Sequence, residues 1–345
     1  MRAFVFPGQG GQVPEPTEEL LPKIRQIVGE RVPDQVKVFA RAAQDARDTE
    51  FLELRPNVVA GHSLGEYGAA HAAGCFDLET GLWLVAQRDR FMSEAAEKTP
   101  GGMVAILQAP SDEVDRALED LDGSVVTANY NTPKQTVISG LKDALGEAVS
   151  RLRSVRGRTV RLNVSLAAHS PYVAVAGERM RETLESVEFH QPEVPMVSAM
   201  DGTVLQSAEA VKEALKDQMV SPVRWVRVVE TLARLRVEEW VELGGGNVLT
   251  RMLRDFEVSV RGVNFEEIRS RLGERLGEQI PSVNLEEIRA RISEQTSLVN
   301  LEEIRARLGQ QAQSLLPRRA PGEEAPGPDV PEPAAETPRD QPPEA

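Results

Sequence analysis

The chain alternates between short apolar runs and longer amphipathic stretches, which is the pattern of an α/β protein. Residues 57–76 show it most clearly, because a β-branched run meets a turn flanked by glycines and then an alanine-rich stretch. This order predicts a strand, a tight turn and a helix. Apolar residues at helical spacing predict further helices at residues 17–31, 35–48 and 78–98.

Residues 101–163 form a unit of their own. Strands are predicted at residues 103–107, 125–128, 136–139 and 159–164, and amphipathic helices at 111–121 and 144–152. Their order, β-α-β-β-α-β, is that of a ferredoxin-like module. The larger pattern of strands and helices resumes in residues 164–262, where we expect a strand from Leu162 to Leu166 to precede His169.

Residues 263–316 carry one motif written three times. Val-Asn-Phe-Glu-Glu-Ile-Arg at 263–269 returns at 283–289 and 299–305 with leucine in place of phenylalanine. In each copy the asparagine caps a helix, and a glutamate three residues later completes a capping box. Narrow apolar stripes cannot build a core alone, so these helices must pack on the rest of the chain, on each other or on a partner. A multivalent docking element for a synthase and simple helical padding both fit the pattern.

Composition limits the possible functions. The net charge of −14 argues against a nucleic-acid-binding protein. The single cysteine, Cys75, excludes an internal disulfide and a multi-cysteine metal site, and no apolar run is long enough to span a membrane. We therefore expect a cytoplasmic protein with no bound metal and neither a membrane nor a nucleic-acid partner. Residues 317–345 contain nine prolines among 29 residues and are expected to form a disordered tail.

The turn at residues 61–65 is the strongest candidate for chemistry. Gly61 and Gly65 flank Ser63 because side chains at those positions would collide with the strand or the helix. The serine then stands at a helix N-terminus, where free amides favour developing negative charge. This is the geometry of an activated nucleophile. A glycine-rich loop at residues 7–12 follows the first strand, and such a loop can bring backbone amides close to a reacting carbonyl.

These motifs resemble those of the acyltransferases that load malonyl groups from coenzyme A onto acyl carrier protein in fatty acid and polyketide synthesis. The resemblance begins with Phe-Pro-Gly-Gln-Gly at residues 6–10 and Gly-His-Ser-Leu-Gly-Glu-Tyr at 61–67. Further matches follow in order at residues 87–92, 101–103, 129–133, 168–170, 221–225 and 242–246. The resemblance implies a hydrolase-like three-layer core, made of residues 1–100 and 164–262, with the ferredoxin-like subdomain 101–163 inserted in it.

The resemblance also implies a catalytic Ser-His pair. Three of the four histidines are poor candidates for the general base by position, since His62 adjoins the serine, His71 lies two helical turns beyond it and His190 stands in a polar loop. Position and family motif both leave His169 as the base for Ser63. The family places a backbone carbonyl at Gln218 to hold this histidine, so the pair would be a dyad without a carboxylate.

The resemblance assigns the remaining site residues. The backbone amides of Gln9 and Leu64 would form the oxyanion hole, and Arg88 would bind the free carboxylate of the malonyl group. A planar guanidinium suits that role because it offers two parallel donors to a carboxylate. Leu64 resembles malonyl-selective members, whereas Ala168 stands where many of them have phenylalanine, so a branched malonyl group is a second possible substrate.

The implied reaction uses malonyl-coenzyme A as a substrate and needs no bound cofactor, because the phosphopantetheine is carried by the partner, an acyl carrier protein. Five arginines, Arg151, Arg153, Arg156, Arg158 and Arg161, lie within eleven residues of this acidic chain. They are a candidate surface for docking an acidic carrier. A solvated helix end that balances nearby acids explains them equally well.

The chain departs from the family between the glycine-rich loop and the serine. The family has a longer stretch there, with a Thr-Gln-Pro segment that feeds a helix beneath the nucleophile, and we expect this segment to be missing. Either the core is shortened with the site retained, or the site is poorly supported. Two alternatives to a transacylase follow: an acyl hydrolase that clears carrier-bound thioesters, against which Arg88 argues, and a degenerate transacylase that acts as a scaffold.

Overall fold

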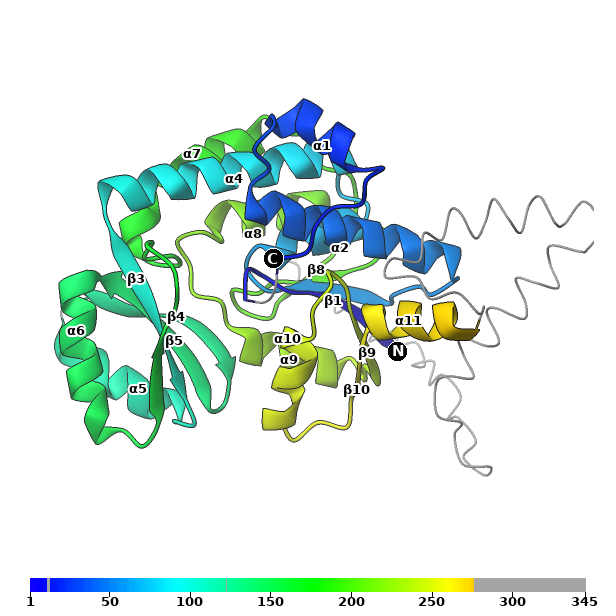
Figure 1. The fold of residues 1–345 in the computed structure, drawn as a ribbon. Helices are drawn as coiled ribbons and strands as arrows, with labels where there is room; N and C mark the ends of the chain where they lie inside the picture. The colour runs from blue at the N-terminus through cyan, green and yellow to red at the C-terminus, as the bar shows by residue number, and fades with distance from the viewer. Residues whose placement is uncertain (11–12, 122, 276–345) are drawn as a thin grey trace, which may run out of the picture. The chain divides into compact units, whose positions relative to one another are not determined.

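A computed structural model of the chain describes residues 1–10, 13–121 and 123–275. This part of the chain contains a six-stranded sheet covered by helices and a four-stranded sheet with two helices of its own (Figure 1). The protein is therefore α/β, as predicted. The second and third copies of the repeat and the proline-rich tail at residues 317–345 lie outside the described residues.

The larger sheet has the strand order β10-β9-β1-β2-β7-β8. All neighbours pair in parallel except β7 and β8, which are antiparallel. The strands are β1 (Arg2–Phe6), β2 (Val58–Gly61), β7 (Met196–Val197), β8 (Val204–Leu205), β9 (Glu239–Glu242) and β10 (Arg261–Asn264). The boundary expected at residue 262 thus falls inside β10, and the first copy of the repeat belongs to this sheet.

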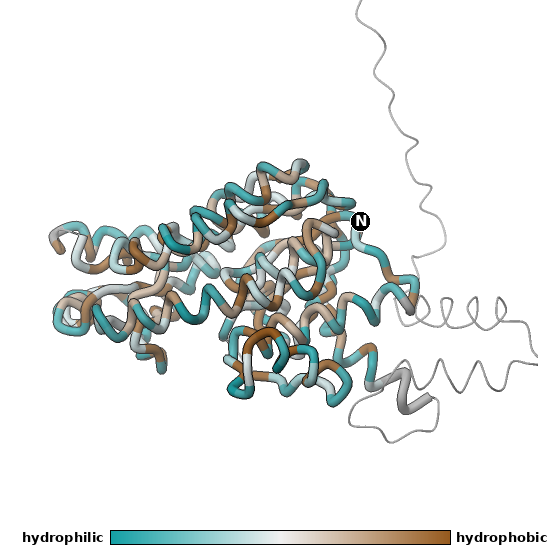
Figure 2. Tube along the Cα trace, turned by 90° about the horizontal axis from the view of Figure 1, so that it is seen from above, coloured by the Kyte–Doolittle hydropathy of each residue, from teal (hydrophilic) through white to brown (hydrophobic). Residues whose placement is uncertain are grey.

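Helices cover both faces of the larger sheet, because successive side chains of a strand point to opposite sides. Phe4 and Phe6 of β1 pack into one core cluster, and Ala3 and Val5 pack into a second. The first cluster is completed mainly by α1 (Leu21–Val28), α2 (Asp34–Phe51), α3 (Gly65–Ala72), α4 (Leu78–Lys98), α7 (Ala174–Glu185) and α8 (Ala208–Asp217). The second is completed by α9 (Trp225–Arg234) and α10 (Val248–Met252). Hydrophobic and hydrophilic residues alternate along these helices (Figure 2), as expected for helices that bury one face.

The smaller sheet has the predicted β-α-β-β-α-β order. Its strands are antiparallel in the order β4-β5-β3-β6. The elements are β3 (Gly101–Leu107), α5 (Ser111–Leu118), β4 (Val125–Thr132), β5 (Gln135–Leu141), α6 (Lys142–Arg151) and β6 (Arg158–Arg161). Both helices pack on one face of the sheet through a separate cluster that includes Val104, Val114, Ile138 and Leu145. The unit therefore has its own core.

One sequence-based expectation differs from the structure. The strand expected from Leu162 to Leu166 is absent, since β6 ends at Arg161 and the next residues form no regular element. Apolar residues there favour a strand, but the segment is the irregular return from the smaller unit to the larger one. The helix expected at residues 35–48 is present as α2, which packs against α3 and α4.

Candidate active site

Ser63 lies in a sharp turn between β2 and α3. Its φ of 54° is in the left-handed region, which a residue other than glycine adopts only when the surrounding structure enforces it. A Cβ built on Gly61 would lie 2.1 Å from the carbonyl carbon of Gly65, and one built on Gly65 would lie 2.0 Å from the carbonyl oxygen of Phe6. Both flanking positions therefore require glycine, as the sequence predicted.

His169 lies against this serine. Its Nε2 is 2.8 Å from Ser63 Oγ, and its Nδ1 is 3.1 Å from the carbonyl oxygen of Gln218 and 3.0 Å from that of Ser221. Because carbonyls can only accept, Nδ1 carries the proton and Nε2 is left as the acceptor for the serine hydroxyl. Burial, followed by the nearby charge of Arg88, lowers the pKa of His169 to about 4. The imidazole is therefore neutral, and able to accept a proton, at neutral pH.

The other histidines have different partners. His62 Nε2 is 2.8 Å from Asn131 Oδ1, and its ring packs against Trp225. His71 Nδ1 is 3.0 Å from the carbonyl oxygen of Phe76. Among the described residues, His169 is thus the histidine that contacts the Ser63 hydroxyl.

Arg88 lies on α4, and its guanidinium group contacts Ser63. Its side chain is 1% exposed, and its Nη2 donates to Ser63 Oγ at 3.2 Å. The Nη1 donates to Gln35 Oε1, and Nε donates to Gln218 Oε1 at 3.4 Å. Within the described part of the chain, no carboxylate lies close enough to form an ion pair with Arg88. Burial lowers the pKa of Arg88, and the carboxylates of Asp89 and Glu66 oppose this only through attraction without direct contact, so the site is suited to bind an anion.

Two site residues were not identified from the sequence. Gln35 lies in the first turn of α2 and contacts Arg88, and Glu66 is fully buried in the first turn of α3. Glu66 Oε2 accepts from Gln218 Nε2 at 2.8 Å, and its Oε1 accepts from the Ala199 amide at 2.9 Å. Burial raises the pKa of Glu66 to about 7. Its place directly after the Gly-His-Ser-Leu-Gly motif was the only sequence signal.

Gln218 does more than the sequence suggested. Besides its carbonyl contact to His169, its Nε2 donates to the backbone oxygen of Ser63 at 2.7 Å and to Glu66. One residue of the segment after α8 therefore touches the serine backbone, the histidine and, through Oε1, Arg88. The relative positions of these three groups depend on this glutamine.

The glycine-rich loop lies beside the elbow. A Cβ on Gly8 would lie 2.8 Å from the carbonyl oxygen of His62 and 3.7 Å from Ser63 Cβ. Gln9 follows Gly8 in this loop, and Leu64 follows Ser63 at the start of α3. The segments that carry the two expected oxyanion amides, 55 positions apart in the sequence, thus meet at the serine.

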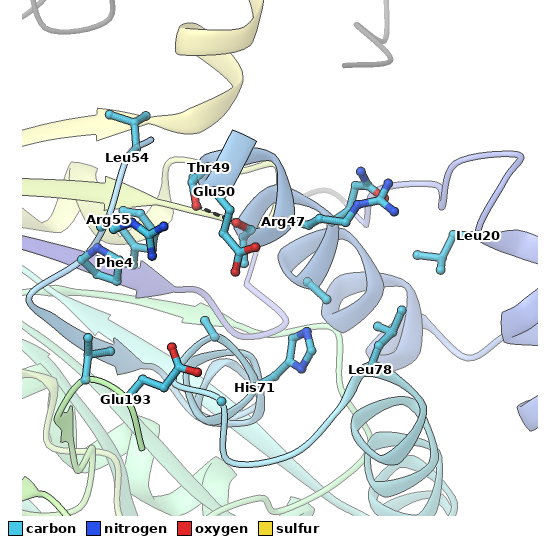
Figure 3. Close-up of a pocket in the computed structure, with 17 residues that line it drawn as sticks. Phe4, Leu20, Arg47, Thr49, Glu50, Leu54, Arg55, His71, Leu78 and Glu193 are labelled. Atoms are coloured by element: carbon cyan, nitrogen blue, oxygen red, sulfur yellow. Dashed lines mark hydrogen bonds between the residues drawn. The ribbon is translucent and has the colours of Figure 1, made fainter. Parts of the chain in front are cut away.

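A pocket of about 460 Å³ opens next to His169. It is lined from the smaller unit by Asp115, Thr127 and Tyr130, and from the larger one by His169 and Arg224. A second cavity of about 530 Å³, lined by Phe4, His71 and neighbouring residues of α2, includes none of the serine, histidine or arginine described above (Figure 3). The first pocket, although the smaller of these two, has His169 in its lining, whereas Ser63 and Arg88 line neither of the two.

The described residues hold no cluster of three or more side chains able to bind a metal ion. None of the helices in this part of the chain has the length and apolar character required to cross a bilayer.

Comparisons with known proteins show which families and structures the chain is similar to. A family model described as "Acyl transferase domain" matches residues 38–272. The chain is 33% identical over 279 residues to the malonyl CoA-acyl carrier protein transacylase of Synechocystis sp., covering 73% of the chain and 92% of that relative. It is 39% identical over 204 residues to a polyketide biosynthesis malonyl CoA-acyl carrier protein transacylase of Bacillus subtilis, covering 58% of the chain and 69% of the relative.

Solved structures give the same result. The Synechocystis malonyl-CoA:ACP transacylase superposes with a TM-score of 0.70 and 32% identity, covering 76% of the chain and 96% of that structure. A malonyl-transacylase solved in complex with a type II polyketide synthase acyl-carrier protein superposes with a TM-score of 0.72 and 29% identity, covering 76% and 95%.

Proposed function

Because this chain belongs to the malonyl-CoA:acyl carrier protein transacylase family of acyltransferases, we propose that it transfers a malonyl or similar carboxyacyl group from coenzyme A to the phosphopantetheine thiol of an acyl carrier protein. The observation that carries the proposal is the buried Arg88, which contacts the Ser63 hydroxyl and has no carboxylate partner among the described residues. An acyl group that ends in a carboxylate would supply the missing charge. We also assign the layered core to the hydrolase-like class, since a strand–turn–helix elbow carries its nucleophile.

The first half-reaction acylates the serine. Ser63 Oγ passes its proton to His169 Nε2 and attacks the malonyl thioester carbon. The backbone amides of Gln9 and Leu64 stabilise the oxyanion of the tetrahedral intermediate, a contribution of about 10² to 10³ in rate for one such donor. The intermediate collapses with cleavage of the carbon–sulfur bond, and His169 returns the proton to the departing coenzyme A thiolate.

The second half-reaction reverses these roles. The phosphopantetheine thiol of the carrier gives its proton to His169 and attacks the Ser63 ester. The ester bond breaks, and the proton returns to Ser63 Oγ. The two substrates bind in turn, so the kinetics are ping-pong.

Arg88 selects the acyl group. Its hydrogen bonds to Ser63, Gln35 and Gln218 use three of the five N–H groups that a guanidinium offers, and each terminal nitrogen keeps one. Those two donors suit the two oxygens of a carboxylate. A neutral acyl group would leave the buried charge without a counter-ion, which disfavours acetyl groups.

The carrier docks on the arginine-rich face of the smaller unit. All four residues of β6, Arg158 to Arg161, are exposed, and so are Arg153 and Arg156 in the segment before it. An acidic carrier would gain its association rate from this local positive charge in a protein of net charge −14.

A transfer assay tests the proposed function. The full chain is incubated with labelled malonyl- or acetyl-coenzyme A, with and without an acyl carrier protein, and both proteins are analysed by mass spectrometry. The proposal predicts malonyl on Ser63 without carrier and on the phosphopantetheine with it, and little acetyl on either. Release of free malonate without transfer would identify a hydrolase instead. An unmodified Ser63 would favour a degenerate transacylase that acts as a scaffold.

A further inference from the structure

The first copy of the C-terminal repeat is built into the larger sheet. Val263 and Asn264 lie in β10, which pairs in parallel with β9, and the rest of the copy begins α11 (Phe265–Arg275). The Asn264 side chain accepts from the Glu266 amide at 2.7 Å and so caps the helix, as the sequence predicted. Phe265 is fully buried in the core cluster beneath α2. The copy therefore docks as an edge strand followed by a helix.

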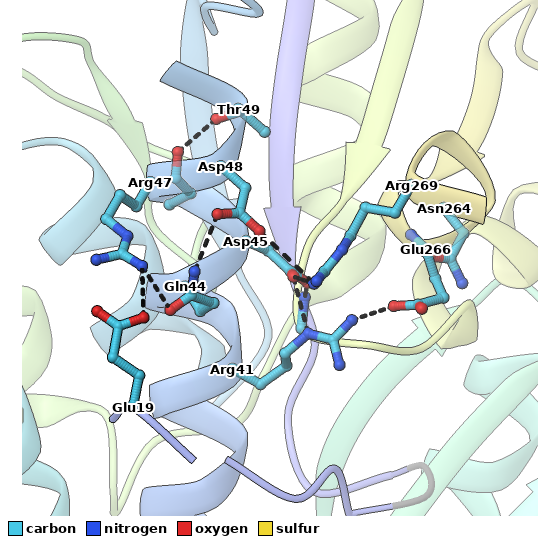
Figure 4. Close-up of polar contacts among 12 residues, drawn as sticks. Glu19, Arg41, Gln44, Asp45, Arg47, Asp48, Thr49, Asn264, Glu266 and Arg269 are labelled. Atoms are coloured by element: carbon cyan, nitrogen blue, oxygen red, sulfur yellow. Dashed lines mark hydrogen bonds and ion pairs between the residues drawn. The ribbon is translucent and has the colours of Figure 1, made fainter. Parts of the chain in front are cut away.

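Polar contacts fix the helix against α2 (Figure 4). Arg269 Nη1 lies 3.2 Å from Asp45 Oδ1 and 3.6 Å from Asp48 Oδ2. Arg41 Nε lies 2.8 Å from Asp45 Oδ1, and its Nη2 forms an ion pair with Glu266. We call the edge of β9 together with Arg41, Asp45 and Asp48 the repeat socket.

The second copy carries the residues that the socket contacts. The equivalents of the five positions just described are Val283, Asn284, Leu285, Glu286 and Arg289. The single change is leucine for Phe265, an apolar residue of smaller volume at a fully buried position. Both the apolar and the ionic halves of the docking surface are thus repeated.

The two residues before each repeat copy indicate how well that copy would fit the repeat socket. The Arg261 amide donates to the carbonyl oxygen of Glu238 at 2.9 Å, whereas Pro281 at the equivalent position has no N–H. A Cβ on Gly262 would lie 3.1 Å from Leu253 Cδ1, which a serine in the second copy disturbs less than Leu298 in the third. The first copy fits best, and the second is the better of the two alternatives.

Loop length adds to this ranking. Five residues, 256–260, join the preceding element to β10, and docking of the second copy would lengthen the connection to 25 residues, 256–280. Closing a loop five times longer disfavours the second copy by about tenfold. The wild-type socket is therefore occupied mainly by the first copy.

We propose that the repeat socket is a docking site for the repeated motif itself, with residues 283–292 of the same chain as its second ligand. When the second copy replaces the first, the C-terminal extension leaves the sheet twenty residues later in the sequence. The occupant is identified by the shared Val-Asn, buried apolar, Glu and Arg positions, and the exchange requires no partner protein.

Hydrogen exchange of the full chain tests this proposal. All variants carry Leu301→Ala and Arg305→Ala, so that only two copies compete. Phe265→Ala with Arg269→Ala then disables the first copy, and Leu285→Ala with Arg289→Ala disables the second. Disabling the first copy should raise the protection of amides 283–292 by about tenfold or more over the parent, with loss of protection in α11. Disabling both should remove that protection and lower the melting temperature further.

Two results would overturn the proposal. The first is a first-copy variant that fails to fold, or that melts like the variant with both copies disabled and gains no protection at residues 283–292. The second is a first-copy variant that becomes dimeric by light scattering, since a second molecule would then supply the ligand. Phe265→Leu is the matched control, because it places the second copy's residue in the first copy and should be accepted with α11 still protected.

Discussion

Two buried arginines in this protein have opposite surroundings. Arg269 is 4% exposed and lies between Asp45 and Asp48, whereas Arg88 is 1% exposed and contacts only neutral groups among the described residues. Breaking a buried ion pair is strongly destabilising, but a buried charge held by amides and a hydroxyl already bears its desolvation cost in the folded state. The first arginine holds the fold together, and the second retains binding capacity for a ligand.

The largest effect is expected from replacing Arg88 with a neutral side chain of similar length. Arg88→Met should lower kcat/KM for malonyl-coenzyme A by about 10³-fold, because the substrate carboxylate would be buried without a partner. The melting temperature should be unchanged or higher, since an uncompensated charge is removed. Steady-state kinetics and thermal unfolding measure the two effects.

Arg88→Lys is the matched control for this variant. Lysine keeps the positive charge but lacks the two parallel N–H donors of a guanidinium, so part of the activity should remain. A melting temperature that falls as steeply as the activity in Arg88→Met would show that Arg88 is structural, like Arg269.

The opposite response is expected at Asp45. Its carboxylate is fully buried and accepts from Arg41, Arg269 and the Gly244 amide. Asp45→Asn should lower the free energy of unfolding by about 3 kcal/mol, because it leaves two guanidinium groups with less counter-charge whichever repeat copy is docked. Denaturant titration measures the loss, and the kcat of the folded fraction should not change. A change in acyl selectivity would show that the Asp45 ion-pair network also acts on the active site.

The pH dependence of kcat/KM should reveal the low pKa of His169, to which the nearby charge of Arg88 contributes. Since the neutral imidazole is the active form, activity falls as pH drops through the pKa of His169, which is about 4 in the free protein. At pH 5 an imidazole with an ordinary pKa of about 6.5 would keep only about 3% of its activity, so the difference at that pH is about 30-fold. Measurement of kcat/KM from pH 4 to 8 should show a flat profile down to about pH 5.

Arg88→Met should move this acid limb to higher pH, because the Arg88 charge is one of the causes that lower the pKa of His169. An acid limb near pH 6.5 in the wild type would contradict the buried, neutral dyad.

The smallest effect is expected on the exposed arginines of the smaller unit. Arg158→Glu with Arg161→Glu should raise KM for the carrier protein by several-fold to about tenfold, and should leave acylation by malonyl-coenzyme A unchanged. Exposed charges act through weak, screened fields, so the effect should shrink as salt is added. Equal effects on both half-reactions, or none on the carrier, would assign these arginines to a solvated surface.

The elbow was predictable because its constraint is local. Gly61 and Gly65 have no room for a side chain, and a strand–glycine–helix pattern is visible within a few residues. The β-α-β-β-α-β unit was predictable for the same reason, since each element follows from the spacing of its own apolar residues.

The features that could not be predicted from the sequence depend on contacts between distant elements. Gln35 meets Arg88 from the first turn of α2, and Glu66 meets Gln218 across 152 positions of the chain. Residue type alone does not reveal such partners. The strand expected at Leu162 to Leu166 failed because apolar residues also occur in an irregular connection, and the first repeat copy joined the sheet because β9 offered it an edge.

The structure of the malonyl-Ser63 intermediate, trapped by adding malonyl-coenzyme A without a carrier, tests the role of Arg88 most directly. The malonyl carboxylate should lie on the two terminal nitrogens of Arg88, with His169 still held by the carbonyls of Gln218 and Ser221. A carboxylate that points to solvent, or that pairs with any other cation while Arg88 keeps only its neutral partners, would contradict it.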